Sequence, residues 1–301
     1  MPKFIPDTSQ SQPRIALLGL GAMGRRMAQR LLSAGFPLAT WSRSGLPADC
    51  DSLASTFRSD ARQAVAEADI VLSMVRDDAA SRELWLDSEH GALESIRKDT
   101  LVLECSTVTP DWALELGAAV EGAGGAFLDA PVLGSRPQAE AGQLIFLVGG
   151  EGTSLSRAEP IFEVCGSAHY PLGQPGAGAR LKLVANALFA IQVATLAELL
   201  PTLAPPHSTA SDRAPLLSPP IQAALERLPV LSPAALGALR GMLAAAFDPM
   251  FPIDLVAKDL GYASSQAGDA PLTAQAHEVF RAASDAGLGG LNLTAIAKRY
   301  G

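Results

Sequence analysis

The chain has 301 residues, of which 48% are hydrophobic and 18% are charged, so it can bury a core large enough for two domains. Its net charge of −8, without any block of lysines and arginines, argues against partners such as nucleic acid or an anionic membrane surface. Its three scattered cysteines exclude a disulfide framework and fit a reducing compartment, and its four histidines have no metal-ligand spacing.

Short apolar segments alternate with helical ones along the first half of the chain. Strands are predicted at 14–18, 36–44, 68–75, 100–107, 124–132 and 142–150. The helix after the first strand should end at Gly35, which suits a helix C-terminus. This alternation, which continues to about residue 170, predicts an α/β fold with a doubly wound, mostly parallel sheet of the Rossmann type.

Beyond residue 175 the strand signal disappears. Segments rich in Ala and Leu predict helices at 176–204, 219–228, 232–246, 252–268 and 271–286. We therefore expect a Rossmann domain over 12–174 and an all-helical domain over 175–301, joined by a long helix. Within the second domain, residues 201–220 contain six prolines in twenty residues, which predicts an irregular connection.

No targeting or membrane segment is expected. The first 14 residues have no apolar core of signal-peptide length, and no uninterrupted apolar run reaches the roughly 18 residues that a membrane span needs. We expect a cytoplasmic protein that does not associate with membranes.

A glycine-rich turn follows the first strand and opens the first helix. Its sequence "GLGAMG" has the G-x-G-x-x-G spacing of dinucleotide-binding turns and lies in the context that this motif requires. A glycine at the first position allows a tight turn, the second lets a pyrophosphate approach the backbone, and the third lets the helix pack close to the sheet. The predicted phosphate-binding residues are Gly19, Leu20, Gly21, Ala22, Met23 and Gly24.

The end of the second strand indicates which cofactor binds. An NAD site usually has an acidic residue there for the ribose hydroxyls. This chain instead has Ser42, Arg43 and Ser44, a guanidinium between two hydroxyls, which suits the 2′-phosphate of NADP. The sequence therefore favours NADP(H) over NAD, although Arg43 could also be an ordinary surface arginine.

The apolar helix that begins near residue 178 contains two polar residues, Lys182 and Asn186. Apolar residues lie on almost every face of this helix, which predicts that it is buried on all sides. Lys182 and Asn186 are four residues apart and so lie on one face. Either Lys182 extends to water from near the helix start, or the pair serves a binding or catalytic purpose.

Five motifs, in this order, resemble those of the β-hydroxyacid dehydrogenase family, whose members include 3-hydroxyisobutyrate dehydrogenase and the glyoxylate/succinic semialdehyde reductases. They are "GLGAMGRRMA", "ECSTVTP", "DAPVLGSRPQAEAGQLIFLVGG", "GAGARLKLVANAL" and "FPIDLVAKDLGYA". The resemblance implies a helical second domain like that of 6-phosphogluconate dehydrogenase. It also implies hydride transfer between NADP(H) and a small β-hydroxyacid or its semialdehyde or 2-oxoacid.

The resemblance also implies roles for single residues. The family's catalytic lysine and its nearby asparagine fall on Lys182 and Asn186, which would also contact the substrate. The family's other cofactor positions fall on Met74 and Val75, before an acidic loop, and on Thr107 and Lys258. Its substrate positions fall on Ser106, Leu133, Gly134 and Ser135. A surface ion pair with Asp259 or Asp254 is the alternative interpretation of Lys258.

This chain departs from the family at the substrate loop. After "DAPV" the family usually has Ser-Gly-Gly, whereas Leu133 here has no hydroxyl to hold a substrate carboxylate. Ser135 could compensate. The proline-rich segment is a second departure.

The alternatives to a dehydrogenase are an imine reductase-like enzyme and a non-catalytic NADP-binding or interaction protein. As an enzyme, the chain should act on a small molecule and form a homodimer or homotetramer.

Overall fold

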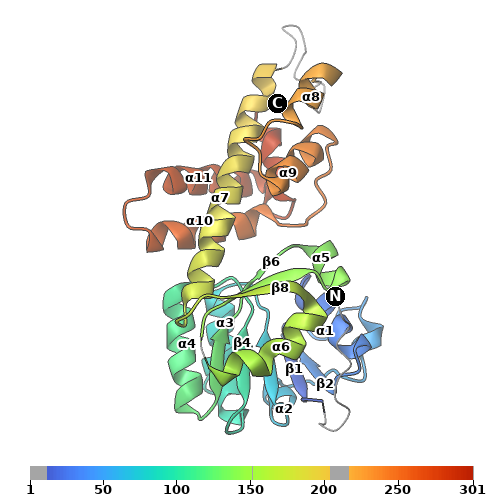
Figure 1. The fold of residues 1–301 in the computed structure, drawn as a ribbon, viewed down its shortest axis with the longest axis vertical. Helices are drawn as coiled ribbons and strands as arrows, with labels where there is room; N and C mark the ends of the chain where they lie inside the picture. The colour runs from blue at the N-terminus through green and yellow to red at the C-terminus, as the bar shows by residue number, and fades with distance from the viewer. Residues whose placement is uncertain (1–11, 151, 204–216, 301) are drawn as a thin grey trace. The chain divides into compact units, whose positions relative to one another are not determined.

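The computed structural model describes residues 12–150, 152–203 and 217–300 (Figure 1). The chain divides into two compact units, Met1–Lys182 and Leu183–Gly301. The boundary between the two units falls inside one long helix.

The first unit contains a five-stranded parallel sheet with the strand order β2-β1-β3-β4-β5. Its strands are β1 (Ile15–Leu18), β2 (Leu38–Trp41), β3 (Ile70–Ser73), β4 (Leu101–Glu104) and β5 (Ala126–Asp129). Its main helices are α1 (Gly24–Ser33), α2 (Ala61–Val65), α3 (Asp78–Leu86), α4 (Pro110–Gly122) and α6 (Thr153–Cys165). The predicted doubly wound parallel sheet is confirmed.

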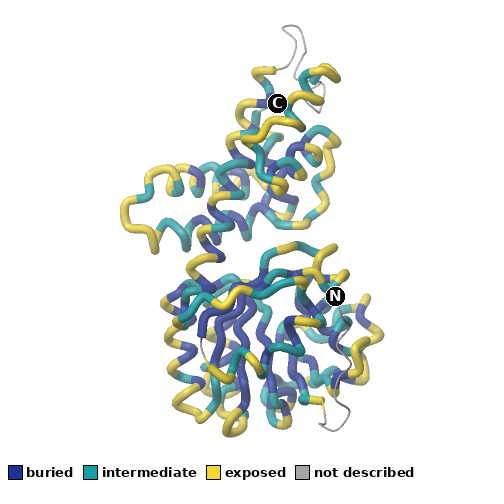
Figure 2. Tube along the Cα trace, in the orientation of Figure 1, coloured by how far each residue is buried: buried dark blue, intermediate teal, exposed yellow. Residues whose placement is uncertain are grey.

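Helices cover both faces of this sheet, and its central strands are apolar except for Ser73 and Glu104 at the ends of β3 and β4. Figure 2 shows these strands in dark blue, and β1, β3 and β4 are buried at every position. In β1, Ile15 and Leu17 pack into the core cluster on one face, while Ala16 and Leu18 pack into the cluster on the other. Continuous apolar strands are typical of a parallel sheet buried on both sides.

A smaller three-stranded sheet adjoins the end of β5. It consists of β6 (Val132–Leu133), β7 (Leu144–Val148) and β8 (Gly166–Pro171), with β6 antiparallel and β8 parallel to β7. The helix α5 (Arg136–Ala141) joins β6 to β7. The single strand predicted at 124–132 is therefore two strands in two sheets. The prediction also missed β8, whose half-exposed, polar sequence gives little strand signal.

The second unit is helical. It holds most of α7 (Ala177–Leu199) together with α8 (Pro219–Leu225), α9 (Pro233–Leu243), α10 (Ile253–Gln266) and α11 (Pro271–Ala283). Leu239, Val256 and Phe280 are among the buried residues of its core. Of the proline-rich segment 201–220, residues 204–216 lie outside the described residues, and short helical turns flank them on both sides.

The helix α7 is not buried on all sides, which corrects the expectation from its composition. Leu181, Val184 and Leu188 have exposed fractions of 40%, 48% and 64%. Alanines such as Ala190 and Ala197 occupy the buried face instead. Within Ala177–Leu203, an 18-residue window has a mean hydropathy of 1.8, so by length and composition this helix could cross a membrane. However, 44% of that window is buried within the protein.

Candidate functional site

The glycine-rich turn connects β1 to α1 at the carboxyl end of the sheet. Gly19 has a φ of +104°, and a Cβ there would lie 2.3 Å from the carbonyl oxygen of Met74. A Cβ on Gly24 would collide with the Gly19 carbonyl, whereas one on Gly21 would meet nothing within 4 Å. The first and third glycines are therefore required by the packing of the turn itself, and the second leaves open space above the backbone.

The residues of this turn fit a dinucleotide pyrophosphate. The side chain of Leu20 is buried and that of Met23 packs against the core, while the carbonyl of Ala22 accepts a hydrogen bond from Arg26. Met23 stands at the N-cap of α1 without a side-chain hydrogen bond to the first turn. A helix N-terminus preceded by an open glycine attracts phosphate through its amides and its dipole.

The ends of three neighbouring strands meet beside this turn. The Gly19 amide donates to the Trp41 carbonyl (2.7 Å), and the Met74 amide donates to the Leu18 carbonyl (2.8 Å). These bonds bring the residues after β2, β1 and β3 to one edge, where the strand order changes direction. In open α/β sheets, ligands bind at this switch point.

Arg43 lies just beyond the end of β2 and is 72% exposed. Its Nη1 is 2.8 Å from the Glu83 carboxylate of α3, and the hydroxyls of Ser42 and Ser44 are 3.3 Å apart. The predicted guanidinium and hydroxyls therefore lie close to one another, but the Glu83 carboxylate already pairs with the guanidinium.

The end of β4 carries a fully buried carboxylate, Glu104. It accepts hydrogen bonds from the Ser81 hydroxyl (2.7 Å) and the Ser106 amide (2.9 Å), and burial raises its pKa. The Ser106 hydroxyl in turn accepts from the Val75 amide (2.8 Å). Ser106, expected at the substrate, thus joins the loops after β3 and β4, and the adjacent Thr107 is partly exposed.

The loop that departs from the family lies between β6 and α5. Leu133 pairs with Ile145 in the small sheet and is partly exposed, and Gly134 has a φ of +117°. Ser135 begins α5, where its amide donates to Gln138 Oε1 (3.0 Å) and its hydroxyl lies 3.2 Å from the same atom. The hydroxyl that could replace the missing serine therefore already takes part in a helix cap.

Lys182 and Asn186 lie one turn apart on α7, and each is only 8% exposed. A lysine that extends to water would be far more exposed, so the burial argues against that alternative. The Asn186 side chain donates from Nδ2 to the Asp259 carboxylate (2.6 Å). Because a carboxylate only accepts hydrogen bonds, Nδ2 is the atom that faces Asp259, and this contact fixes the orientation of the amide.

Lys258 belongs to the second unit, as does its partner Asp259. The Lys258 Nζ is 2.8 Å from Asp259 Oδ1 and 4.8 Å from the centre of the Tyr262 ring. The pairing with Asp259 expected from the sequence is present, but it is not a surface pair, because the Lys258 side chain is only 14% exposed and that of Asp259 only 3%.

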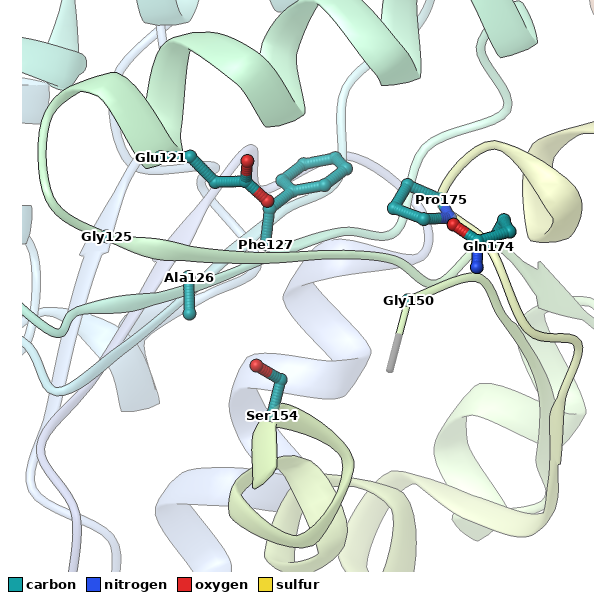
Figure 3. Close-up of a pocket in the computed structure, with 8 residues that line it drawn as sticks. All are labelled: Glu121, Gly125, Ala126, Phe127, Gly150, Ser154, Gln174 and Pro175. Atoms are coloured by element: carbon teal, nitrogen blue, oxygen red, sulfur yellow. The ribbon is translucent and has the colours of Figure 1, made fainter. Parts of the chain in front are cut away.

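One pocket of about 320 Å³ lies elsewhere in the first unit, beside β5 (Figure 3). It is open to solvent, and its lining residues include Glu121, Phe127 and Ser154. None of the predicted site residues lines it, so it is separate from the edge described above.

Sequence reasoning missed two carboxylates at the ends of strands, Glu104 and Asp129. Both are fully buried, and they lie opposite each other in the register of β4 and β5. In the sequence, each appears as an acidic residue that ends an otherwise apolar strand, and this pattern could have identified them. Their hydrogen-bond partners, however, lie in segments that the sequence alone does not bring near.

Comparison with known proteins gives matches along the whole chain. Residues 14–173 match the NAD-binding domain of 6-phosphogluconate dehydrogenase. Glyoxylate/succinic semialdehyde reductase 1 of Arabidopsis thaliana is 31% identical over 290 residues, 94% of this chain and 96% of that protein. The NAD-dependent L-serine dehydrogenase of Pseudomonas aeruginosa is 41% identical over 189 residues, 62% of this chain and 63% of that protein. A structure of the Mycobacterium tuberculosis 3-hydroxyisobutyrate dehydrogenase with L-serine has a TM-score of 0.81 at 27% identity, covering 96% and 99% of the two chains.

Two further matches bear on the alternatives. An imine reductase from a Pseudomonas species shares the fold, with a TM-score of 0.55 at 20% identity over 96% and 99% of the two chains. The zebrafish (Danio rerio) protein named cytokine-like nuclear factor N-PAC is 30% identical over 95% of this chain and 62% of its own length. The domain match, the full-length plant relative and the bacterial structure agree with the motifs, and the chain belongs to the β-hydroxyacid dehydrogenase family of NAD(P)-binding oxidoreductases.

Proposed function

We propose that the protein is an NADP(H)-preferring oxidoreductase that interconverts a small β-hydroxyacid and its semialdehyde or 2-oxoacid. The observation that carries this proposal is the burial of Lys182 on α7, one turn from an asparagine whose amide is held by Asp259. A lysine ammonium has three N–H donors, so Lys182 can donate to a reacting oxygen in addition to its partners within the protein.

The proposed cofactor contacts are divided along the chain. Gly19–Gly24 would hold the pyrophosphate, Ser42–Ser44 the 2′-phosphate, and Met74 and Val75 the adenine-side ribose. Thr107 would contact the nicotinamide side, and Lys258 is a further proposed cofactor contact. When bound, the cofactor supplies or accepts the hydride at the substrate carbon.

The role of Lys182 follows from charge. Reduction of a carbonyl places negative charge on its oxygen, and an ammonium within hydrogen-bond reach stabilises that charge and then donates the proton. In the oxidation direction, the neutral amine accepts the proton of the alcohol. Asn186 lies one turn along the same helix, and its amide, oriented by Asp259, can orient the ammonium or bind the same substrate oxygen.

The substrate class rests on the relatives and on the loop around Leu133. The plant relative is named for glyoxylate and succinic semialdehyde, and the bacterial ones for L-serine and 3-hydroxyisobutyrate; all are small acids. We propose that the Gly134 amide holds the acid group, that the Ser135 amide and hydroxyl join it when they release Gln138 Oε1, and that Ser106 is a further contact. A cytoplasmic location and a homodimer or homotetramer belong to the same proposal, and the exposed leucines of α7 favour self-association.

The test is a screen for NADPH oxidation with glyoxylate and with succinic, methylmalonic and tartronic semialdehydes, followed by Lys182→Ala. We expect Lys182→Ala to lower kcat by about 10²–10⁴, the range of general acid catalysis, while NADPH still binds. Arg180→Ala is the matched control, since it removes an exposed cation two residues earlier on the same helix. Turnover by Lys182→Ala within threefold of wild type would refute the catalytic assignment.

The alternatives predict different results in the same screen. An imine reductase-like enzyme would oxidise NADPH with a cyclic imine and leave the semialdehydes unreduced. A non-catalytic protein would bind NADPH and turn over neither kind of substrate.

A further inference from the structure

Asp129 is the last residue of β5 and has no exposed surface. Its backbone forms two hydrogen bonds with Gly149, so that the strand end is held from both sides: the Asp129 amide donates to the Gly149 carbonyl (3.1 Å), and the Gly149 amide donates back (2.8 Å). The carboxylate therefore projects from a strand end that is hydrogen-bonded to the segment after β7.

The Asp129 carboxylate caps the start of α7. The Gly176 amide donates to Oδ1 (2.7 Å), and the Ala179 amide donates to Oδ2 (2.8 Å). The first amides of a helix have no acceptor within the helix itself and need one from elsewhere. The local sequence "GQPGAGAR" offers no Ser, Thr, Asp or Asn for this purpose. The cap instead comes from a strand 47 residues earlier.

Close packing reinforces these two hydrogen bonds. A Cβ on Gly178 would lie 2.2 Å from the Leu147 carbonyl oxygen of β7 and 2.8 Å from Asp129 Oδ2. A Cβ on Gly149 would lie 2.2 Å from Asp129 Oδ1. The first turn of α7 thus rests directly on the carboxylate and on the backbone of β7, where any larger residue would move it.

Lys182 follows this anchored turn at once. It lies three residues after Ala179, which corresponds to a rise of about 4.5 Å along the helix. The Ala179 side chain is 1% exposed and packs into the core of the first unit. Any shift or rotation of the first turn would therefore be transmitted to the base of the Lys182 side chain.

We infer that Asp129 is a positioning residue for Lys182: its two hydrogen bonds fix the first turn of α7 and thereby the place of the lysine ammonium. This inference rests on the proposed function, because it concerns a lysine that acts on substrate. It gives Asp129 an effect on turnover without contact to cofactor or substrate.

The experiment compares Asp129→Asn and Asp129→Glu with wild type. Asparagine keeps one acceptor but turns an NH₂ group toward the second amide, and glutamate keeps the charge but is longer by one methylene group. We expect each to lower kcat roughly 10–100-fold, because a displacement of about 1 Å costs on the order of 10² in rate. The NADPH dissociation constant should stay within about twofold, since the glycine-rich turn is not touched.

The matched control is Asp69→Asn, the same substitution at the opposite end of the sheet. Asp69 precedes β3 and accepts from the Arg14 amide (2.8 Å) and from two guanidinium groups. It should cost stability and leave kcat per NADPH-binding site unchanged. Gly178→Ala serves as a further variant, because its methyl group displaces the same turn with Asp129 intact.

The outcomes separate the two proposals. If Lys182→Ala loses turnover while both Asp129 variants and Gly178→Ala keep kcat within twofold, the positioning role is wrong and the proposed function stands. If NADPH-binding sites are lost in proportion to kcat, Asp129 acts only on folding and the inference is equally overturned. If Lys182→Ala keeps its turnover, the proposed function itself fails.

Discussion

Arg43 lies where a cofactor phosphate is expected, and its guanidinium already forms an ion pair with Glu83. Its guanidinium lies at the end of β2, where the second ribose of a dinucleotide is expected, and the Glu83 carboxylate is 2.8 Å away. A 2′-phosphate would have to share the guanidinium with Glu83. Cofactor preference then depends on both residues, and not only on the arginine that the sequence singles out.

Arg43→Ala should raise the NADPH dissociation constant about tenfold or more and leave that of NADH nearly unchanged. A hydrogen bond to a charged group contributes about 1.5–3 kcal/mol, and the exposure of Arg43 favours the lower end. Glu83→Gln should act in the opposite direction and tighten NADPH binding severalfold, because it removes a competing negative charge. Fluorescence titration with both cofactors measures these changes.

The control for this pair is Arg82→Ala, since Arg82 is also exposed and paired with a glutamate, Glu115, but lies away from β2. It should change neither dissociation constant. Equal losses for NADPH and NADH in Arg43→Ala would mean that Arg43 does not contact the 2′-phosphate.

Leu133 is the second position where a single residue should decide specificity. Leu133→Ser restores the hydroxyl that relatives carry, while Leu133→Ala removes the apolar surface without adding one. If the acid group of the substrate lies at this loop, Leu133→Ser should raise kcat/KM for short semialdehydes roughly tenfold, consistent with one hydrogen bond to a charged group. Leu133→Ala should not.

A decrease for Leu133→Ser on the best substrate, with no gain on any other, would indicate a pocket adapted to a less polar acid. Equal activity of wild type and both variants toward every carbonyl compound would show that position 133 does not face the substrate.

At the scale of elements, α7 is the part of the fold whose properties were hardest to derive from the sequence. The absence of Pro and Gly over most of its length predicted a long helix. The four-residue spacing of Lys182 and Asn186 predicted that both lie on one face of it. Its cap was not, because the acceptor lies on β5. The partner of Asn186 was equally hidden, since Asp259 lies 73 residues later on α10. The sequence predicts contacts within one element far better than contacts between distant ones.

The cap of α7 has a measurable dependence on pH. Burial raises the pKa of Asp129 to about 6 from the usual 3.8, although the amides of Ala179 and Gly176 act in the other direction. The folded protein thus binds this proton more tightly than the unfolded chain does. The resulting stabilisation is fully present below about pH 4 and is lost as the pH rises through about 6.

Asp129→Asn has no proton to release and should remove this dependence. Between pH 4 and 7, the free energy of unfolding of wild type should fall by about 2 kcal/mol relative to that of the variant. Urea denaturation of both proteins at several pH values measures the difference, and other titrating groups cancel in the comparison. A difference that stays constant over this range would show that Asp129 does not titrate there.

At the scale of the whole molecule, the class of fold and the parallel, doubly wound character of the large sheet could be predicted. Apolar strands, a glycine turn in the right context and helical periodicity each indicate the same architecture, and they depend only on local sequence. The small sheet was missed because β6 has two residues and β8 is half exposed, so neither shows an apolar pattern. The exposed leucines of α7 were missed because hydropathy alone does not tell a buried face from an uncovered one.

The buried carboxylates at the ends of β4 and β5 also matter for attempts to improve this protein by selection. Both are ionisable groups without contact to solvent, and burial raises the pKa of each. Neutral replacements at such positions are attractive to any screen that rewards resistance to heat, since strained or desolvated functional groups are where stability and activity conflict. A library ranked by melting temperature alone would therefore tend to collect changes at Glu104 and Asp129. Engineering of this enzyme should hold those two positions fixed or score turnover in the same round.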